Sequence, residues 1–233
     1  MKSSRVNNQK AQKTQSRYLN PNVSYRIADI RYYLSVYKPF IEKGVALKRV
    51  ERDFICLFNC VWYQDFPVFK GEYINRSNWT IHVGLVMREC AKLMGARTFF
   101  EQGGRTDAVL RYPDNQILTY VEWEYNQADR DSVNELDKLF EKNDKCYFST
   151  FVSYCQHENI NIVIEKASRI WSEASRPLIF FLITYEPQAK KSRHFLELRT
   201  YFFSNSKRKL VRKQPALPWD IEQRKYNLEQ DAG

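Results

Sequence analysis

Residues 104–125, GRTDAVLRYPDNQILTYVEWEY, predict one β-hairpin. Both arms alternate between residues suited to a buried face and polar residues, which is the period of a half-buried strand. The residues of that face are Ala108, Leu110 and Tyr112 on the first arm and Ile117, Thr119, Val121 and Trp123 on the second. Pro113–Gln116 separates the arms and has the composition of a turn. We therefore expect the two arms to be neighbouring antiparallel strands.

The register of this hairpin predicts a cluster of three carboxylates at its open end. A two-residue loop at Asp114–Asn115 matches the two apolar faces and places Asp107 opposite Glu122. Glu124 lies two residues farther along, on the same face as Glu122. Like charges on opposed residues destabilise a strand pair, and a divalent cation with oxygen ligands would remove that conflict. The alternative is three solvated surface acids, and a loop of different length would shift the pairing by one residue.

An Asp, a hairpin and then Glu-x-Glu resembles the PD-(D/E)xK nuclease superfamily, to which many type II restriction endonucleases belong, over residues 78–186. In that superfamily the first acid and the first residue of the triplet bind Mg²⁺, and these positions correspond to Asp107 and Glu122. Thr106 stands where the motif has Pro. Glu124 stands where it has Lys, and some restriction enzymes of the superfamily use Glu there as a metal ligand or general base. The resemblance implies that Asp107, Glu122 and Glu124 are catalytic and hold Mg²⁺, with Mn²⁺ able to substitute.

Glu89 is a fourth candidate metal ligand. A helix predicted from Ser77 or Asn78 to Met94 carries this acid on a side otherwise made by apolar residues. In the superfamily that the hairpin resembles, the helix before the hairpin often sends an acid to the metal site. The alternative is a Glu at the edge of the apolar face that reaches water.

The order of the predicted elements agrees with this resemblance. Helix, three strands, helix and strand form the αβββαβ core of restriction-endonuclease-like proteins, an α/β (α+β) fold in which helices flank a mixed sheet. Beyond the hairpin and its preceding helix, the elements predicted from periodicity are strand Arg97–Glu101, helix Asp131–Asn143, strand Cys146–Tyr154, helix Asn161–Ala174, strand Leu178–Tyr185 and strand Phe195–Phe203. We expect a disordered basic arm at 1–20, an N-terminal helical extension packed on the core at 21–75, the nuclease core at 76–205 and a basic C-terminal segment at 206–233.

The net charge favours an anionic partner. Thirty-seven Lys and Arg residues against 27 Asp and Glu give a formal charge of +10, which suits nucleic acid, an anionic membrane surface or an acidic protein. The C-terminal cluster that we assign to DNA binding comprises Lys207, Arg208, Lys209, Arg212 and Lys213. Solvated basic segments are the alternative for both this cluster and the N-terminal arm.

Several other classes of protein are disfavoured. No run of about 20 apolar residues is present to span a bilayer, and no signal peptide opens the chain, so we expect a cytoplasmic protein without a membrane partner. Five cysteines, an odd number, indicate reduced thiols. No glycine-rich phosphate loop, Walker lysine motif or nucleophilic serine elbow occurs.

Together these features predict a Mg²⁺-dependent endonuclease that hydrolyses phosphodiester bonds in double-stranded DNA, with a restriction-type role as the leading candidate. Cleavage of both strands is most simply done by two copies of one site, so we expect a homodimer. The alternative is a non-catalytic DNA-binding protein that keeps the nuclease fold with a degenerate site.

Overall fold

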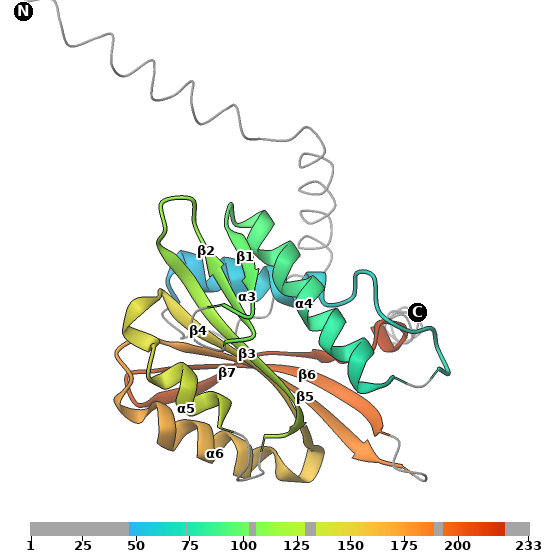
Figure 1. Ribbon diagram of the computed structural model, residues 1–233. Helices are drawn as coiled ribbons and strands as arrows, with labels where there is room; N and C mark the ends of the chain where they lie inside the picture. The colour runs from blue at the N-terminus through green and yellow to red at the C-terminus, as the bar shows by residue number, and fades with distance from the viewer. Residues whose placement is uncertain (1–46, 73, 103–105, 129–133, 189–192, 222–233) are drawn as a thin grey trace, which may run out of the picture. The chain divides into compact units, whose positions relative to one another are not determined.

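The computed structural model describes residues 47–72, 74–102, 106–128, 134–188 and 193–221 (Figure 1). The predicted basic arm at 1–20, residues 21–46 of the predicted N-terminal helical extension and the end of the basic C-terminal segment at 222–233 lie outside these described residues. Within the described part of the chain, no helix is both long enough and apolar enough to cross a bilayer. All five cysteines lie in the described part of the chain, where they are buried and form no disulfide bond with one another.

A seven-stranded mixed sheet forms the centre of the fold, and its strands follow one another in chain order (Figure 1). The strands are β1 (Arg97–Phe100), β2 (Ala108–Arg111), β3 (Ile117–Gln127), β4 (Phe148–Gln156), β5 (Leu178–Pro187), β6 (Arg193–Ser204) and β7 (Lys207–Pro215). The β3–β4 and β4–β5 pairs are parallel and the other four pairs are antiparallel. Parallel neighbours need a crossover connection, which α5 and α6 supply here.

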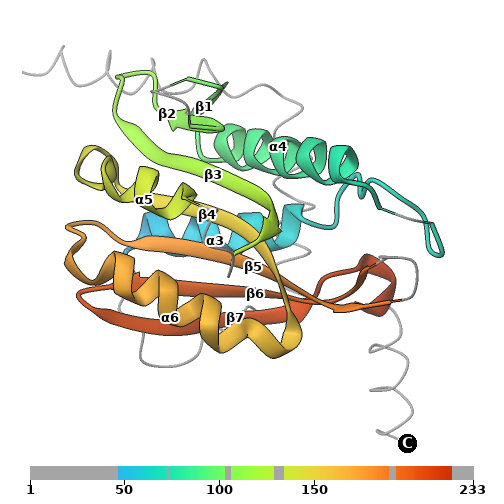
Figure 2. The same ribbon diagram turned by 60° about the horizontal axis from the view of Figure 1, so that its bottom comes forward.

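Helices cover both faces of the sheet (Figures 1 and 2). One face packs against α3 (Arg49–Val61) and α4 (Arg76–Leu93), and the other packs against α5 (Glu135–Phe140) and α6 (Ile160–Ile170). Burial on both faces explains why β5 is apolar almost throughout. The order α4, β1, β2, β3, α5, β4 is the predicted αβββαβ order, so the predicted mixed sheet flanked by helices is confirmed.

The predicted register of the hairpin is confirmed, although the predicted loop is wrong. Ala108 pairs with Val121 and Leu110 with Thr119. The backbone N–H of Tyr112 donates to the carbonyl of Gln116, which makes the loop one residue longer than the predicted two-residue turn. An irregularity after Leu110 absorbs the extra residue, so the pairing at the open end is unchanged.

Several predicted boundaries differ from the structure. The N-cap of α4 is Asn75, whose side chain accepts a hydrogen bond of 2.8 Å from the backbone N–H of Asn78, so the helix begins before the predicted Ser77 or Asn78. α5 is only six residues long because a 3-10 turn at Asn143–Lys145 follows it. Residues 207–215 are a strand paired with β6 rather than a tail.

Candidate metal centre

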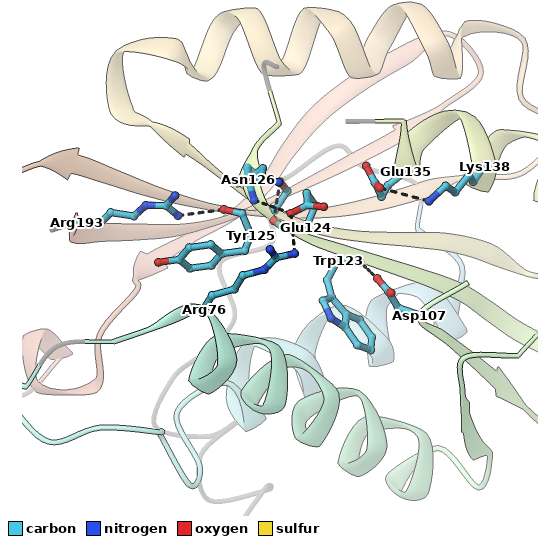
Figure 3. A network of polar contacts seen from close by, with 10 residues as sticks. Arg76, Asp107, Trp123, Glu124, Tyr125, Asn126, Glu135, Lys138 and Arg193 are labelled. Carbon is cyan, nitrogen blue, oxygen red and sulfur yellow. Dashed lines mark hydrogen bonds and ion pairs between the residues drawn. The ribbon is translucent and has the colours of Figure 1, made fainter. Parts of the chain in front are cut away.

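Asp107 and Glu122 meet at the open end of the hairpin. Asp107 directly precedes β2, Glu122 lies in β3, and the adjacent residues Ala108 and Val121 are paired. The two carboxyl groups are close enough for each to shift the pKa of the other. Asp107 Oδ2 also accepts a hydrogen bond of 2.7 Å from the backbone N–H of Trp123 (Figure 3). The structure therefore brings together the two acids that the sequence predicts as metal ligands.

Glu122 is buried to a degree that is rare for an acid. Its side chain is 1% exposed, and its Oε1 atom has no hydrogen-bond partner among the described residues. Glu122 pairs with Phe151 of β4, whose ring lies in the apolar core beneath α5 and α6. Buried polar atoms are almost always hydrogen-bonded, so this oxygen is available to accept a hydrogen bond or to bind a cation.

Burial also controls the protonation of the pair. Loss of solvent, together with the neighbouring charge of Asp107, raises the pKa of Glu122 to about 8. Burial raises the pKa of Asp107 as well, against the lowering effect of the hydrogen bond from Trp123. Two carboxyl groups in contact cannot both ionise cheaply, so the pair shares a proton near neutral pH. A divalent cation could take the place of that proton.

The structure does not bring Glu124 to this pair. Glu124 Oε1 accepts a hydrogen bond of 2.7 Å from the backbone N–H of Asn126 and lies 3.9 Å from Nη2 of Arg76 in α4 (Figure 3). Glu122 and Glu124 keep regular pairing with Phe151 and Ser153 of β4, so the contacts with Asn126 and Arg76, rather than a change of face, direct the Glu124 side chain. Glu122 and Glu124 therefore do not form one site, although alternation predicts that they share a face.

Glu89 does not join the pair either. It lies on α4, which covers the opposite face of the sheet from the face that Glu122 occupies. Its Oε2 atom is 3.8 Å from Nζ of Lys92. Among the residues that the structure describes, no three acidic, histidine or cysteine side chains are arranged to hold a metal ion.

Two residues that sequence reasoning missed lie beside the pair, both on α5. Glu135 Oε1 is 3.4 Å from Nζ of Lys138 (Figure 3). The charge of Lys138 lowers the pKa of both Asp107 and Glu122, and the charge of Glu135 raises both. The only sequence signal was the spacing of these two charges on a predicted amphipathic helix, which does not say where the helix packs.

The basic residues assigned to DNA binding lie in β7, at the far edge of the sheet. β7 is four strands from β3, which is about 19 Å at the usual strand spacing. Arg208 is ion-paired with Glu165 of α6 at 2.6 Å, and Lys213 with Glu197 of β6 at 2.6 Å. The described members of this cluster are thus partly neutralised by neighbours, and they alternate between the two faces of an edge strand.

A Mg²⁺ ion fits the donors that are present. Mg²⁺ is usually bound through one or two carboxylates, with water and substrate phosphate oxygens completing its shell. Asp107 and Glu122 supply two adjacent carboxylates, and Glu122 Oε1 is an oxygen that lacks a partner among the described residues. The pair therefore suits Mg²⁺, whereas a site made only of protein ligands would need Glu124 to move.

The fold and the site define a mixed α+β protein with a buried carboxyl pair at the end of its central hairpin. The sequence matches no protein-family model and no curated protein. Among solved structures, the chain is similar to the YaeQ protein from Pseudomonas syringae, with 10% identity, a TM-score of 0.29 and coverage of 63% of this chain and 80% of that one. It is also similar to the YaeQ protein from Xanthomonas axonopodis pv. citri, with 9% identity, a TM-score of 0.27 and coverage of 57% and 79%. The functional interpretation depends on the site itself.

Proposed function

We propose that this protein is a Mg²⁺-dependent endonuclease that hydrolyses phosphodiester bonds in double-stranded DNA. The observation that carries the proposal is the juxtaposed pair Asp107–Glu122, in which the buried Oε1 of Glu122 has no hydrogen-bond partner among the described residues. Burying two acids together costs free energy that a purely structural residue would avoid. Strongly shifted pKa values of this kind gather at functional sites.

Asp107 and Glu122 would hold the cation through their carboxylate oxygens. A bound Mg²⁺ would lower the pKa of the attacking water and neutralise charge on the phosphate. Asp107 keeps its orientation because the Trp123 N–H fixes one of its oxygens. In the reaction, the oxygen of water bonds to phosphorus while one ester bond from phosphorus to oxygen breaks. Water gives up one proton and the leaving oxygen gains one, so a phosphodiester becomes a phosphomonoester and a hydroxyl group.

Glu124 is the proposed general base, in keeping with the role that Glu has at this position in some members of the superfamily. To reach the water it must leave Arg76 and the backbone N–H of Asn126. The ion pair with Arg76 is long and Arg76 is mostly exposed, so breaking it costs little. Substrate binding would then complete the site by moving one side chain.

Duplex DNA is the proposed substrate because of the charge of +10. A duplex is about as wide as the separation between β3 and β7, so the basic strand could contact the same DNA molecule as the carboxyl pair. We propose a restriction-type role for the enzyme, and a homodimer to cut both strands. A monomeric mass by sedimentation, with and without DNA, would contradict the dimer.

A non-catalytic DNA-binding protein is the second candidate. It is favoured by the contacts of Glu124 with Arg76 and Asn126, which leave two acids rather than three at the pair. Such a protein would bind DNA equally with Mg²⁺ and with chelator, whereas the enzyme would cleave only with the metal.

Plasmid cleavage separates the two candidates. Supercoiled DNA is incubated with the protein and Mg²⁺, Mn²⁺ or EDTA, and the conversion to linear or fragmented DNA is followed. We expect cleavage with either metal and none with EDTA. Glu122→Gln should slow cleavage by about 100-fold or more, because a metal ligand contributes several kcal/mol to the barrier. Glu173→Gln changes an exposed acid after α6 in the same way and should cleave normally.

A further inference from the structure

We infer that Lys138 binds the scissile phosphate beside the Asp107–Glu122 pair and supplies the positive charge that the Glu-x-Glu triplet lacks. This inference rests on the proposed nuclease function. The positively charged side chain of the site then comes from α5 rather than from the hairpin.

The second strand of the hairpin offers no such charge. The strand β3, Ile117–Gln127, contains neither Lys nor Arg, and Glu124 occupies the position of the motif's lysine. Glu124 is in turn held toward Arg76, away from the pair. A phosphodiester entering this site would meet buried carboxyl groups, so a cation besides the metal is needed to offset the charge on the phosphate.

Lys138 is placed to do this by the packing of α5. Leu136 and Leu139 are buried in the core that also contains Tyr120 of β3, and this fixes which side of α5 faces the sheet. Glu135 and Lys138 lie one turn apart on a neighbouring side, above Asp107 (Figure 3). The charge of Lys138 lowers the pKa of both Asp107 and Glu122, although these acids belong to different arms of the hairpin.

Exposure makes Lys138 accessible to a substrate. Its side chain is 43% exposed, whereas that of Glu135 is 15% exposed. The ammonium group is therefore at the boundary between the buried pair and solvent, where a phosphate of bound DNA would arrive. An ammonium has three N–H donors, so it can keep its contact with Glu135 and donate to a phosphate oxygen as well.

The helix that carries Lys138 is anchored at its other end. Asn143 donates from Nδ2 to the carbonyl of Phe140. Its Oδ1 atom accepts from the backbone N–H and hydroxyl of Ser175 at 2.9 and 2.8 Å and from the N–H of Arg176 at 3.2 Å. These bonds tie the end of α5 to the segment before β5, so Lys138 sits on a fixed element, as a binding group requires.

The test compares Lys138→Met and Lys138→Arg with the matched control Lys145→Met, an exposed lysine in the turn after α5. Two quantities are measured: the single-turnover rate of plasmid cleavage at saturating protein and Mg²⁺, and the Mg²⁺ affinity without DNA, taken from the rise in Tm. We expect Lys138→Met to slow cleavage by about 100-fold and Lys138→Arg to keep most of the rate. Mg²⁺ affinity should rise in Lys138→Met, because a positive charge beside the ligands is gone. Lys145→Met should leave both quantities unchanged.

Each outcome has one meaning. Cleavage by Lys138→Met at the wild-type rate would overturn the inference, and so would a Mg²⁺ affinity that changes no more than in Lys145→Met. If the wild-type protein cleaves no DNA with any metal, the proposed function fails and this role for Lys138 fails with it. In that case the Mg²⁺ measurement still reports whether the lysine lies at the pair.

Discussion

Glu122 and Asp107 lie close enough for each carboxyl group to shift the pKa of the other, and Glu122 Oε1 is buried without a hydrogen-bond partner among the described residues. A carboxyl pair of this kind stores unfavourable free energy in the protein without metal. Protonation of the pair and binding of a cation to it should therefore each change the stability of the protein by a measurable amount.

The pKa of Glu122 makes the stability of the metal-free protein depend on pH. This pKa is about 8 in the folded protein against a usual value of 4.5, so between these values the folded state binds more protons than the unfolded state. The free energy of unfolding should therefore fall as pH rises from 4.5 to 8. Glu122→Gln should flatten this slope, as measured by denaturant unfolding at a series of pH values. An identical slope in the variant would mean that Glu122 is ionised in the folded protein.

Mg²⁺ should raise the Tm of the wild-type protein, because a ligand that binds only the folded state stabilises it, by about 2.7 kcal/mol at 100 times its Kd. Asp107→Ala should lose this rise and abolish cleavage. Without metal, the variant should be about as stable as the wild type, because relief from the crowded carboxyl pair offsets the lost hydrogen bond to Trp123. A full Mg²⁺ response in Asp107→Ala would place the cation elsewhere.

Glu124→Gln should separate metal binding from catalysis. Because Glu124 contacts Arg76 and Asn126 rather than the pair, the Mg²⁺-induced rise in Tm without DNA should equal that of the wild type. Cleavage should slow by about 100-fold or more, the usual effect of removing a general base. A loss of Mg²⁺ affinity in this variant would show instead that Glu124 is a ligand in the loaded site.

His82 should make the protein sensitive to acid. Its ring is buried against Trp62 and Phe66, and burial lowers its pKa to about 4. As pH falls from 6.5 to 4, the unfolded state takes up the proton before the folded state does. The free energy of unfolding should therefore decrease by about 3 kcal/mol over this range. His82→Gln should remove that part of the acid slope in denaturant unfolding. A slope retained in full would assign the acid sensitivity to other groups.

Affinity for duplex DNA should fall steeply with salt, because basic side chains displace counterions from phosphates. Lys207 is exposed at the start of β7, and Lys207→Ala should reduce the slope of log K against log salt by about 0.9 if it contacts one phosphate. Lys92→Ala, on α4 next to Glu89, serves as the control. Fluorescence anisotropy with a labelled duplex measures the DNA affinity of both variants at a series of salt concentrations. An affinity independent of salt would contradict a DNA partner.

The sequence was sufficient for the hairpin and its register. A shift of one residue would turn every apolar side chain of β3 to the other face, so the apolar pattern admits one pairing even though the loop differs from the predicted one. Because Asp107 and Glu122 flank a paired position, their contact followed from the same pattern. Alternation could not predict the helix caps and ends, which depend on single hydrogen bonds such as that of Asn75.

Tertiary contacts determine which groups the long polar side chains reach. Glu124 has the same strand parity as Glu122, but the backbone N–H of Asn126 and the position of Arg76 on α4 direct it elsewhere. Lys138 reaches the carboxyl pair because Leu136 and Leu139 dock α5 against β3. Local periodicity determines which face of a helix or strand is apolar. It does not determine which other element that face meets, because that depends on the packing of segments far apart in the chain.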